Sequence, residues 1–112
     1  MDNFNIVIKQ IIKKSLFTER QIEIITSIGG GPRTISRGAY YRQRGQAKRK
    51  TEALLYSMVL LYGLDILPRD SMRAAAAIAD QVSVIFDSDI DDTTAREVLS
   101  VVEQAVDRAM GK

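Results

Sequence analysis

The 112-residue sequence contains no cysteine and no histidine. Without cysteine there is no disulfide framework and no thiolate metal site, a pattern typical of proteins of the reducing cytoplasm. Without histidine the chain lacks the commonest general base and the commonest metal ligand. These absences predict a protein that is not an enzyme, with no catalytic residues, no metal and no cofactor.

Long apolar runs are also missing. The longest, Ala53 to Tyr62, is interrupted by Ser57 and is far shorter than the roughly 20 residues of a membrane span. The first residues, M-D-N-F-N, carry an acid early and lack the basic and apolar regions of a secretory signal. The expected location is therefore the cytoplasm, in association with the nucleoid, without a membrane partner.

Charge is divided unevenly along the chain. Residues 1–63 contain 11 Lys and Arg against 4 Asp and Glu, a net charge of +7, whereas residues 64–112 contain 5 against 10, a net charge of −5. No acid lies between Glu23 and Glu52, and that interval holds seven bases: Arg33, Arg37, Arg42, Arg44, Lys48, Arg49 and Lys50. Such an asymmetry predicts a polyanionic partner for the first half and a different role for the second.

Apolar residues recur at helical spacing in five segments, which predicts an all-α fold. The expected helices cover residues 3–14, 18–28, 36–62, 70–86 and about 94 to the end. Thr18 and Gln21 form a capping box before the second helix, with Ile22, Ile25 and Ile28 buried, and Thr94 and Glu97 form another before the fifth. We expect a single domain over residues 1–112. Its parts are a basic helix-turn-helix over 1–63 and an acidic helical hairpin over 64–112 that serves dimerisation.

The third segment, Ser36 to Leu61, has two different halves. Its first half is basic with a thin apolar stripe, and Ala53 to Leu61 is apolar on all sides. A helix that is apolar all round is normally buried, whereas a basic one projects. We therefore expect Ala53 to Leu61 to be anchored in the core or in a dimer interface. Whether the helix is continuous through Gly45 stays open, and Gly63 is the expected left-handed cap at its end.

The fourth and fifth helices complete the pattern with apolar seams. In the fourth, Met72, Ala75, Ala79, Val82 and Phe86 recur at spacings of three and four, as in a coiled coil. This seam and the apolar segment Leu54 to Leu61 offer more apolar surface than five short helices of one chain readily cover. The sequence therefore predicts a homodimer through Leu54–Leu61 and the C-terminal helices.

The basic stretch has the composition of a nucleic-acid-binding surface. Lys and Arg neutralise phosphates and release counterions, Arg also recognises guanine edges, and Tyr donates to phosphate or stacks on bases. On a helix of 100° per residue, Arg37, Tyr41 and Arg44 are the expected groove contacts. The expected phosphate contacts are Arg33, Arg42, Lys48 and Arg49, and Tyr40 and Lys50 complete the surface. A solvated charged face is the alternative, but it normally mixes both signs of charge.

Two segments resemble a known family. L-F-T-E-R-Q-I-E-I-I, Leu16 to Ile25, followed by I-S-R-G-A-Y-Y-R-Q-R-G-Q-A-K-R-K, Ile35 to Lys50, resembles region four of bacterial sigma factors and response-regulator output domains. It also resembles small archaeal helix-turn-helix proteins. The sigma-type proteins have a further helix between the two pieces, for which residues 27–34 are too few. The resemblance implies duplex DNA binding, with Arg37, Tyr40, Tyr41 and Arg44 at the recognition positions.

Two other patterns carry no site. Asp87, Asp89 and Asp91 alternate as in a calcium loop, but the required glycine is replaced by Asp92 and the closing glutamate by Val98. The glycines at 29–31 lack the G-K-[ST] signature of a phosphate loop and predict a turn instead.

The function expected from the sequence is duplex DNA binding, most simply by a transcriptional regulator that inserts residues 37–50 into the major groove. Two alternatives remain: an RNA-binding or ribosome-associated module that uses the same basic face, and a protein-interaction adaptor without nucleic acid.

Overall fold

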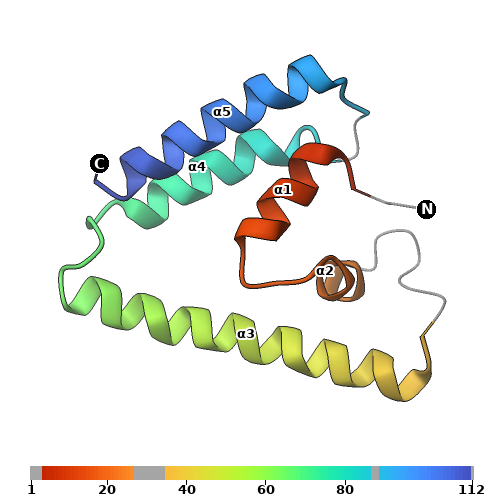
Figure 1. Cartoon of the computed structure of the whole chain (residues 1–112). Coiled ribbons are helices and arrows are strands. Elements are labelled where there is room, and N and C mark those ends of the chain that lie inside the picture. Colours follow the sequence, from red (N-terminus) through yellow and green to blue (C-terminus); the bar gives the residue numbers. More distant parts are fainter. Residues whose placement is uncertain (1–3, 27–34, 87–88, 112) are drawn as a thin grey trace.

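The computed structural model describes residues 4–26, 35–86 and 89–111, and in this part of the chain it contains five α-helices and no strand (Figure 1). The helices are α1 (Ile6–Lys14), α2 (Glu19–Thr26), α3 (Arg37–Gly63), α4 (Ser71–Ser83) and α5 (Asp92–Ala109). The all-α fold with a long central helix is thus confirmed.

Helix α1 joins the two parts of the molecule. Its N-cap is Asn5, whose Oδ1 accepts from the Ile8 amide at 3.0 Å and whose Nδ2 donates to the Ile85 carbonyl at 2.6 Å. The apolar face predicted for this segment is buried and forms a cluster of Phe4, Ile8 and Ile12, against which Ile22, Val82 and Phe86 pack. The rings of Phe4 and Phe86 meet edge to face with centroids 5.9 Å apart. This cluster connects α2 on one side to the C-terminal hairpin on the other.

Helix α2 begins with the predicted capping box. The Gln21 amide donates to Thr18 Oγ1 and the Thr18 amide donates to Gln21 Oε1, both at 3.1 Å. The predicted burial of Ile25 is wrong, since Ile25 is 43% exposed and Ile24 is buried. The reason is that α2 lies between two neighbours: it packs against α1, where Ile22 joins the cluster, and against α3. Ile28 lies outside the described residues.

Helix α3 is continuous through Gly45 and has Ser36 as its N-cap, with Oγ accepting from the Ala39 amide at 3.1 Å. Its end differs from the prediction. Gly63 is the last helical residue, and the left-handed position is taken by Asp65, with φ of 57°. The Asp65 amide donates to the Tyr62 carbonyl and the Ile66 amide to the Leu61 carbonyl, the two bonds of a Schellman cap. Aspartate tolerates this conformation better than most side chains.

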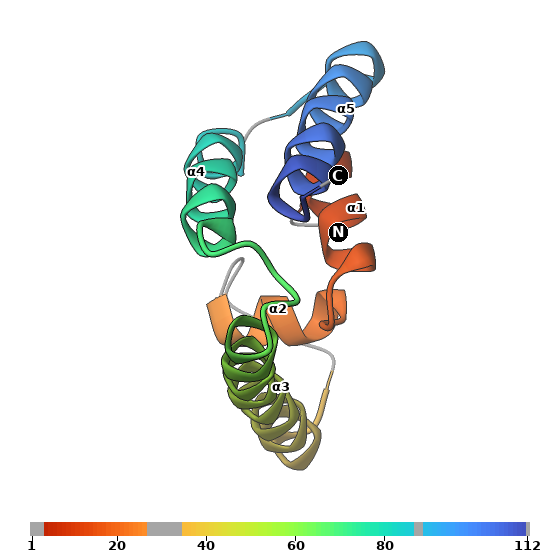
Figure 2. The ribbon, with the colours of Figure 1, turned by 90° about the vertical axis from the view of Figure 1, so that its left-hand side faces the viewer.

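Helices α4 and α5 form the predicted antiparallel hairpin and lie side by side in both ribbon views (Figures 1 and 2). Ser71 Oγ donates to the Ala109 carbonyl at 2.6 Å where α4 begins and α5 ends. The predicted start of α5 is wrong: the N-cap is Asp91, whose carboxylate accepts from the Thr94 amide at 2.7 Å. Aspartate is at least as good an N-cap as threonine, and capping by Asp91 in place of Thr94 adds residues 92–94, three in all, to the helix.

The predicted seam of α4 is only partly covered. Val82 and Phe86 pack on the α1 cluster, but Met72, Ala75 and Ala79 are exposed. The seam was inferred from spacing alone, and the face of α4 that meets α5 is instead the one that carries Ser71, Ala74 and Ile78.

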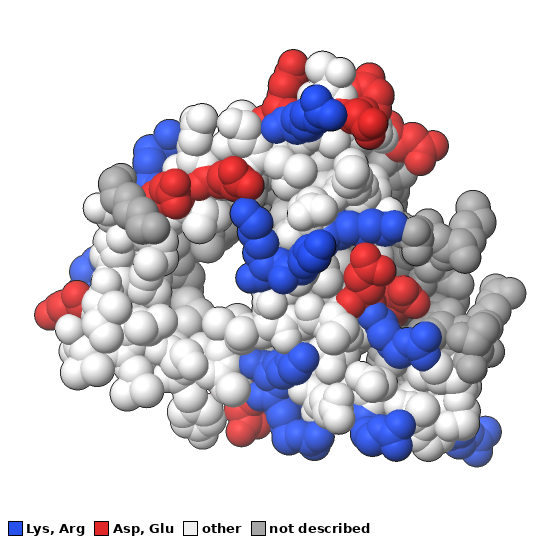
Figure 3. Space-filling model, viewed as in Figure 1, with Lys and Arg blue, Asp and Glu red and all other residues white. Residues whose placement is uncertain are grey.

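The arrangement is open. Within the described residues α3 packs against α2 and against no other helix. The radius of gyration is 15.6 Å, compared with about 13 Å for a compact chain of this length. A space-filling view shows an opening between α3 and the C-terminal hairpin (Figure 3).

This openness overturns the expectation that Ala53 to Leu61 is anchored in the core of the chain. Leu55, Tyr56, Val59 and Leu60 are each more than half exposed, whereas Ala47, in the basic half, is fully buried. The reason is that α2 packs on the basic half, and residues 64–70 lead α4 away from the apolar half. The alternative of a dimer interface remains a prediction.

Candidate nucleic-acid interface

The basic half of α3, residues 37–50, is held crosswise by α2 (Figures 1 and 2). Gln21 of α2 is only 2% exposed and makes the polar contacts between the two helices. Its Oε1 accepts from Lys50 Nζ at 2.7 Å, and its Nε2 donates to the side-chain oxygens of Gln43 at 3.3 Å and Gln46 at 3.4 Å. These contacts span two turns of α3 and therefore fix its rotation about its own axis.

With the rotation fixed, one flank of α3 presents four predicted site residues: Arg37, Tyr41, Arg44 and Lys48. Their spacing of four, three and four residues places them within an arc of about 60°, along about 17 Å of helix. All four side chains are exposed, and Tyr41 is 59% exposed. Blue side chains gather over this part of α3 in the space-filling view, whereas its C-terminal part is largely white (Figure 3). We call these four residues the basic flank.

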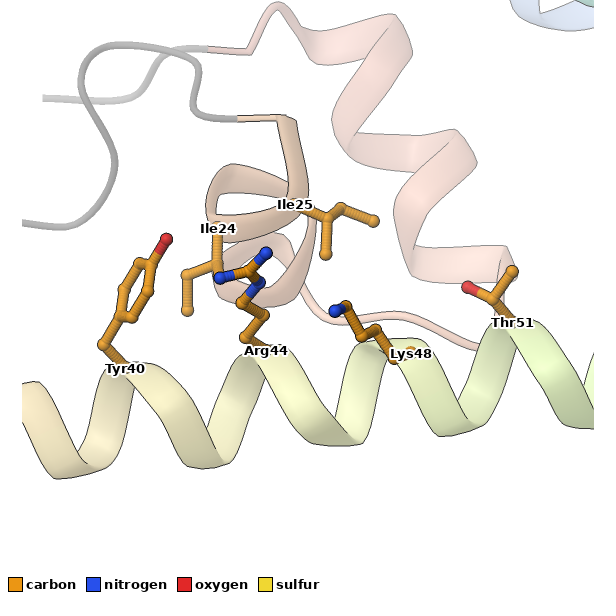
Figure 4. Close-up of a pocket in the computed structure, with 6 residues that line it drawn as sticks. All are labelled: Ile24, Ile25, Tyr40, Arg44, Lys48 and Thr51. Carbon is orange, nitrogen blue, oxygen red and sulfur yellow. The ribbon is translucent and has the colours of Figure 1, made fainter.

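Part of the basic flank borders a shallow pocket between α2 and α3. Tyr40, Arg44, Lys48 and Thr51 point from α3 toward Ile24 and Ile25 of α2 (Figure 4). The two cations thus stand beside an aliphatic wall.

The two tyrosines differ in their environment. Their rings meet edge to face with centroids 5.4 Å apart; Tyr40 is half-buried and Tyr41 is exposed. Tyr40 therefore supports the ring of Tyr41, which presents both a face for stacking and a hydroxyl group.

The remaining predicted residues are not brought to this flank. Arg42 and Arg49 are exposed on the other side of α3, and the Arg49 guanidinium lies over Gly45. Lys50 is half-buried and its amine is bonded to Gln21. Arg33 lies outside the described residues.

The positive charge of the basic half is not neutralised locally. Two ion pairs are formed in the described residues, Lys14 with Glu103 at 3.1 Å and Arg69 with Asp65 at 3.3 Å, and neither involves α3. Sequence reasoning missed the role of Gln21 in joining α2 to α3. Its place in the capping box gave a sufficient local reason for a glutamine, and nothing in the spacing indicated Gln43, Gln46 and Lys50 as its partners.

Other kinds of site find no support in the described ranges. No group of three acidic, histidine or cysteine side chains suited to a metal ion occurs among them. Likewise, none of the described helices combines the length and apolar character needed to cross a bilayer. Comparison of the chain with protein-family profiles, curated proteins and solved structures finds no match.

Proposed function

We propose that the protein binds duplex DNA through the basic half of α3, with the basic flank in the major groove. The observation that carries this proposal is the basic flank itself: three cations and a tyrosine lie on one side of a helix whose rotation α2 fixes, and none of the three cations forms an ion pair with a described acid. A major groove about 12 Å wide admits an α-helix, and the crosswise contact of α2 is typical of helix-turn-helix units. Regulation of transcription is the role that we propose for this binding.

The chemistry of the flank separates two kinds of contact. Arg37, Tyr41 and Arg44 lie toward the N-terminal end of α3, which is the end that helix-turn-helix proteins direct at base edges. Lys48 lies further along the same flank, and Arg42 and Arg49 lie on the other side, where each can contact a backbone phosphate. Lys50 contributes its charge to the field of the helix while its amine remains bonded to Gln21.

A salt-series binding titration tests the proposal. Fluorescence anisotropy is measured with random duplex DNA, matched duplex RNA and selected genomic fragments, for the wild type and for Arg37→Ala/Arg44→Ala. Each lost base contact costs about 1 to 3 kcal/mol and relaxes the sequence preference, whereas the slope of log K against log salt follows the phosphate contacts, which this variant keeps. The double variant is therefore expected to bind the selected fragments at least about tenfold more weakly, with less preference for them over random duplex DNA and with a similar slope.

Arg96→Ala/Arg108→Ala is the matched control, because both residues are exposed on α5 and the change in net charge is the same. It should leave DNA binding close to that of the wild type. If Arg37→Ala/Arg44→Ala binds DNA no more weakly than this control, the assignment of the basic flank is wrong. Tighter binding of RNA than of DNA at equal salt would replace the proposal with the RNA-binding alternative.

A further inference from the structure

The C-terminal half of α3 forms an apolar surface that the described chain leaves largely uncovered, although Met58, Leu61 and Tyr62 are half-buried. Between Glu52 and Asp65 there is no charged residue. We call residues 53–63 the apolar half of α3. Leu55 is 59% exposed, Tyr56 68%, Val59 69% and Leu60 61%. A helix that is apolar on all sides is stable in water only when other protein buries it, so this exposure calls for a cover.

A second exposed surface lies on the hairpin. Met72 is 54% exposed, and Ala75 and Ala79 are exposed on the same face of α4. The segment that joins α3 to α4 adds Leu64 and Ile66, both at least 60% exposed. In the ribbon view α3 and the hairpin form the two long sides of the opening, and this joining segment closes one end of it (Figure 1). Exposed apolar side chains thus lie on the second half of α3, on the joining segment and on α4.

The accessible surface area of the chain indicates how much surface is left for a partner to cover. The accessible surface of the chain is 8156 Å². A compact protein of 12.5 kDa exposes about 6,200 Å², so the excess is about 2,000 Å². A stable protein interface buries about 800 Å² on each partner. The excess is therefore large enough for an obligate interface.

We propose that the cover is a second copy of this chain. The two copies meet in a two-fold contact in which the apolar half of α3 packs against the same segment of the partner, flanked by the α4 surface of Met72, Ala75 and Ala79. A two-fold interface uses the same patch on both subunits, and a patch without charge meets no like-charge repulsion when it is paired with itself. The alanines of α4 allow a neighbouring helix to approach closely.

The contact involves none of the residues assigned to DNA, so this proposal and the DNA-binding proposal can fail separately. The first test contains no nucleic acid. The mass of the wild type is measured by light scattering and sedimentation at protein concentrations from about 1 to 100 µM. Interfaces of this size have Kd values from micromolar to picomolar, so the upper concentrations populate the dimer for all but the weakest of them. The expected mass is twice the chain mass of 12.5 kDa.

The matched variant is Val59→Glu/Leu60→Glu. Both positions are more than 60% exposed, so in an isolated chain the new carboxylates remain in water. The variant is expected to be monomeric, with helical circular dichroism retained. The control is Leu16→Glu/Val84→Glu, at two exposed apolar positions outside the proposed contact, and it should stay dimeric. A monomeric wild type over the whole range, an assembly larger than two, or a dimeric Val59→Glu/Leu60→Glu variant would overturn the proposal.

Cross-linking keeps the test decisive if the charged variant unfolds. Because the chain has no cysteine, a single substitution supplies its only thiol. Leu55→Cys, Tyr56→Cys, Val59→Cys and Leu60→Cys are oxidised one at a time, with Leu16→Cys as the control. A disulfide requires Cα atoms about 4.4 to 6.8 Å apart, a separation that some position near a two-fold axis in this segment satisfies. At least one of the four should form a covalent dimer faster than Leu16→Cys, and failure of all four would refute the two-fold contact.

Discussion

Replacing Gln21 with leucine separates the polar contacts of the α2–α3 junction from its packing. Gln21 is 2% exposed and bonds to four groups: the Thr18 amide, Lys50 Nζ and the side chains of Gln43 and Gln46. Leucine has a similar volume and cannot form any of these bonds. The substitution therefore keeps the space filled, while the capping box and the polar contacts to α3 are lost.

The expected magnitude follows from the individual bonds. The bond from the Lys50 ammonium is charge-assisted and contributes about 1.5 to 3 kcal/mol, whereas a neutral bond contributes about 1 kcal/mol. Gln43, Gln46 and Lys50 are half-buried, so water recovers part of the loss, and the leucine gains some apolar burial. The net destabilisation should be about 2 to 3 kcal/mol. For a chain of this size that corresponds to a fall in Tm of about 8 to 12 °C.

Urea and thermal unfolding followed by circular dichroism provide the measurement, with Gln21→Glu as the matched comparison. Glutamate keeps the capping box and can pair with Lys50, and the amides of Gln43 and Gln46 can turn to donate to it. Gln21→Glu should therefore be more stable than Gln21→Leu. A double-mutant cycle with Lys50→Met isolates the bond to Lys50. If Gln21→Leu is as stable as the wild type, the polar contacts do not hold α2 on α3 and the reasoning is wrong.

Two further substitutions test single features of the helices. Gly45→Ala should raise the free energy of unfolding by about 0.5 to 1 kcal/mol in urea titrations, because glycine is unfavourable within a helix. The added Cβ would lie 3.5 Å from Arg49 Nη1, which is an ordinary contact. A loss of stability would show that the position is crowded. At the start of α5, hydrogen bonds from the Thr94 backbone and side chain lower the pKa of Asp91, so its contribution to stability is present above its unfolded pKa and is lost as pH falls through the lower folded pKa. Asp91→Asn keeps the cap without titrating, so the stability advantage of the wild type over this variant should shrink below about pH 4, and a pH-independent difference would contradict this.

Features decided by local chemistry were predictable from the sequence. The starts of α2 and α3 follow from Thr18 and Ser36, because a side chain that satisfies free backbone amides acts within its own turn. The common flank of Arg37, Tyr41, Arg44 and Lys48 follows from helix geometry alone. Where two local signals competed, the prediction failed: Asp91 and Thr94 are both suitable caps, and the sequence does not rank them.

Features decided by long-range packing were not predictable. The apolar character of Leu55 and Val59 shows that these residues need a cover, but not whether the same chain supplies it. The contact of the buried Gln21 with three polar residues of α3 was not predictable either, because nothing in their spacing pairs them. This contact holds the basic half of α3 against α2. The usual rule that the apolar end is the anchored one fails here because α2 engages α3 through a polar residue and Ile24.

The two proposals together constrain how two copies meet. The centres of the basic and apolar halves of α3 are about 15 residues apart, which is about 22 Å along the helix. If two such helices meet at the centres of their apolar halves, antiparallel packing separates the basic centres by about 45 Å, whereas successive major grooves on one face of DNA are about 34 Å apart. To place the basic centres about 34 Å apart, the two α3 helices must cross. The directions from the crossing point to the two basic halves then form an angle of about 100°, instead of pointing in opposite directions. Half-sites one turn apart would therefore indicate crossed α3 helices, and a wider spacing would indicate antiparallel ones.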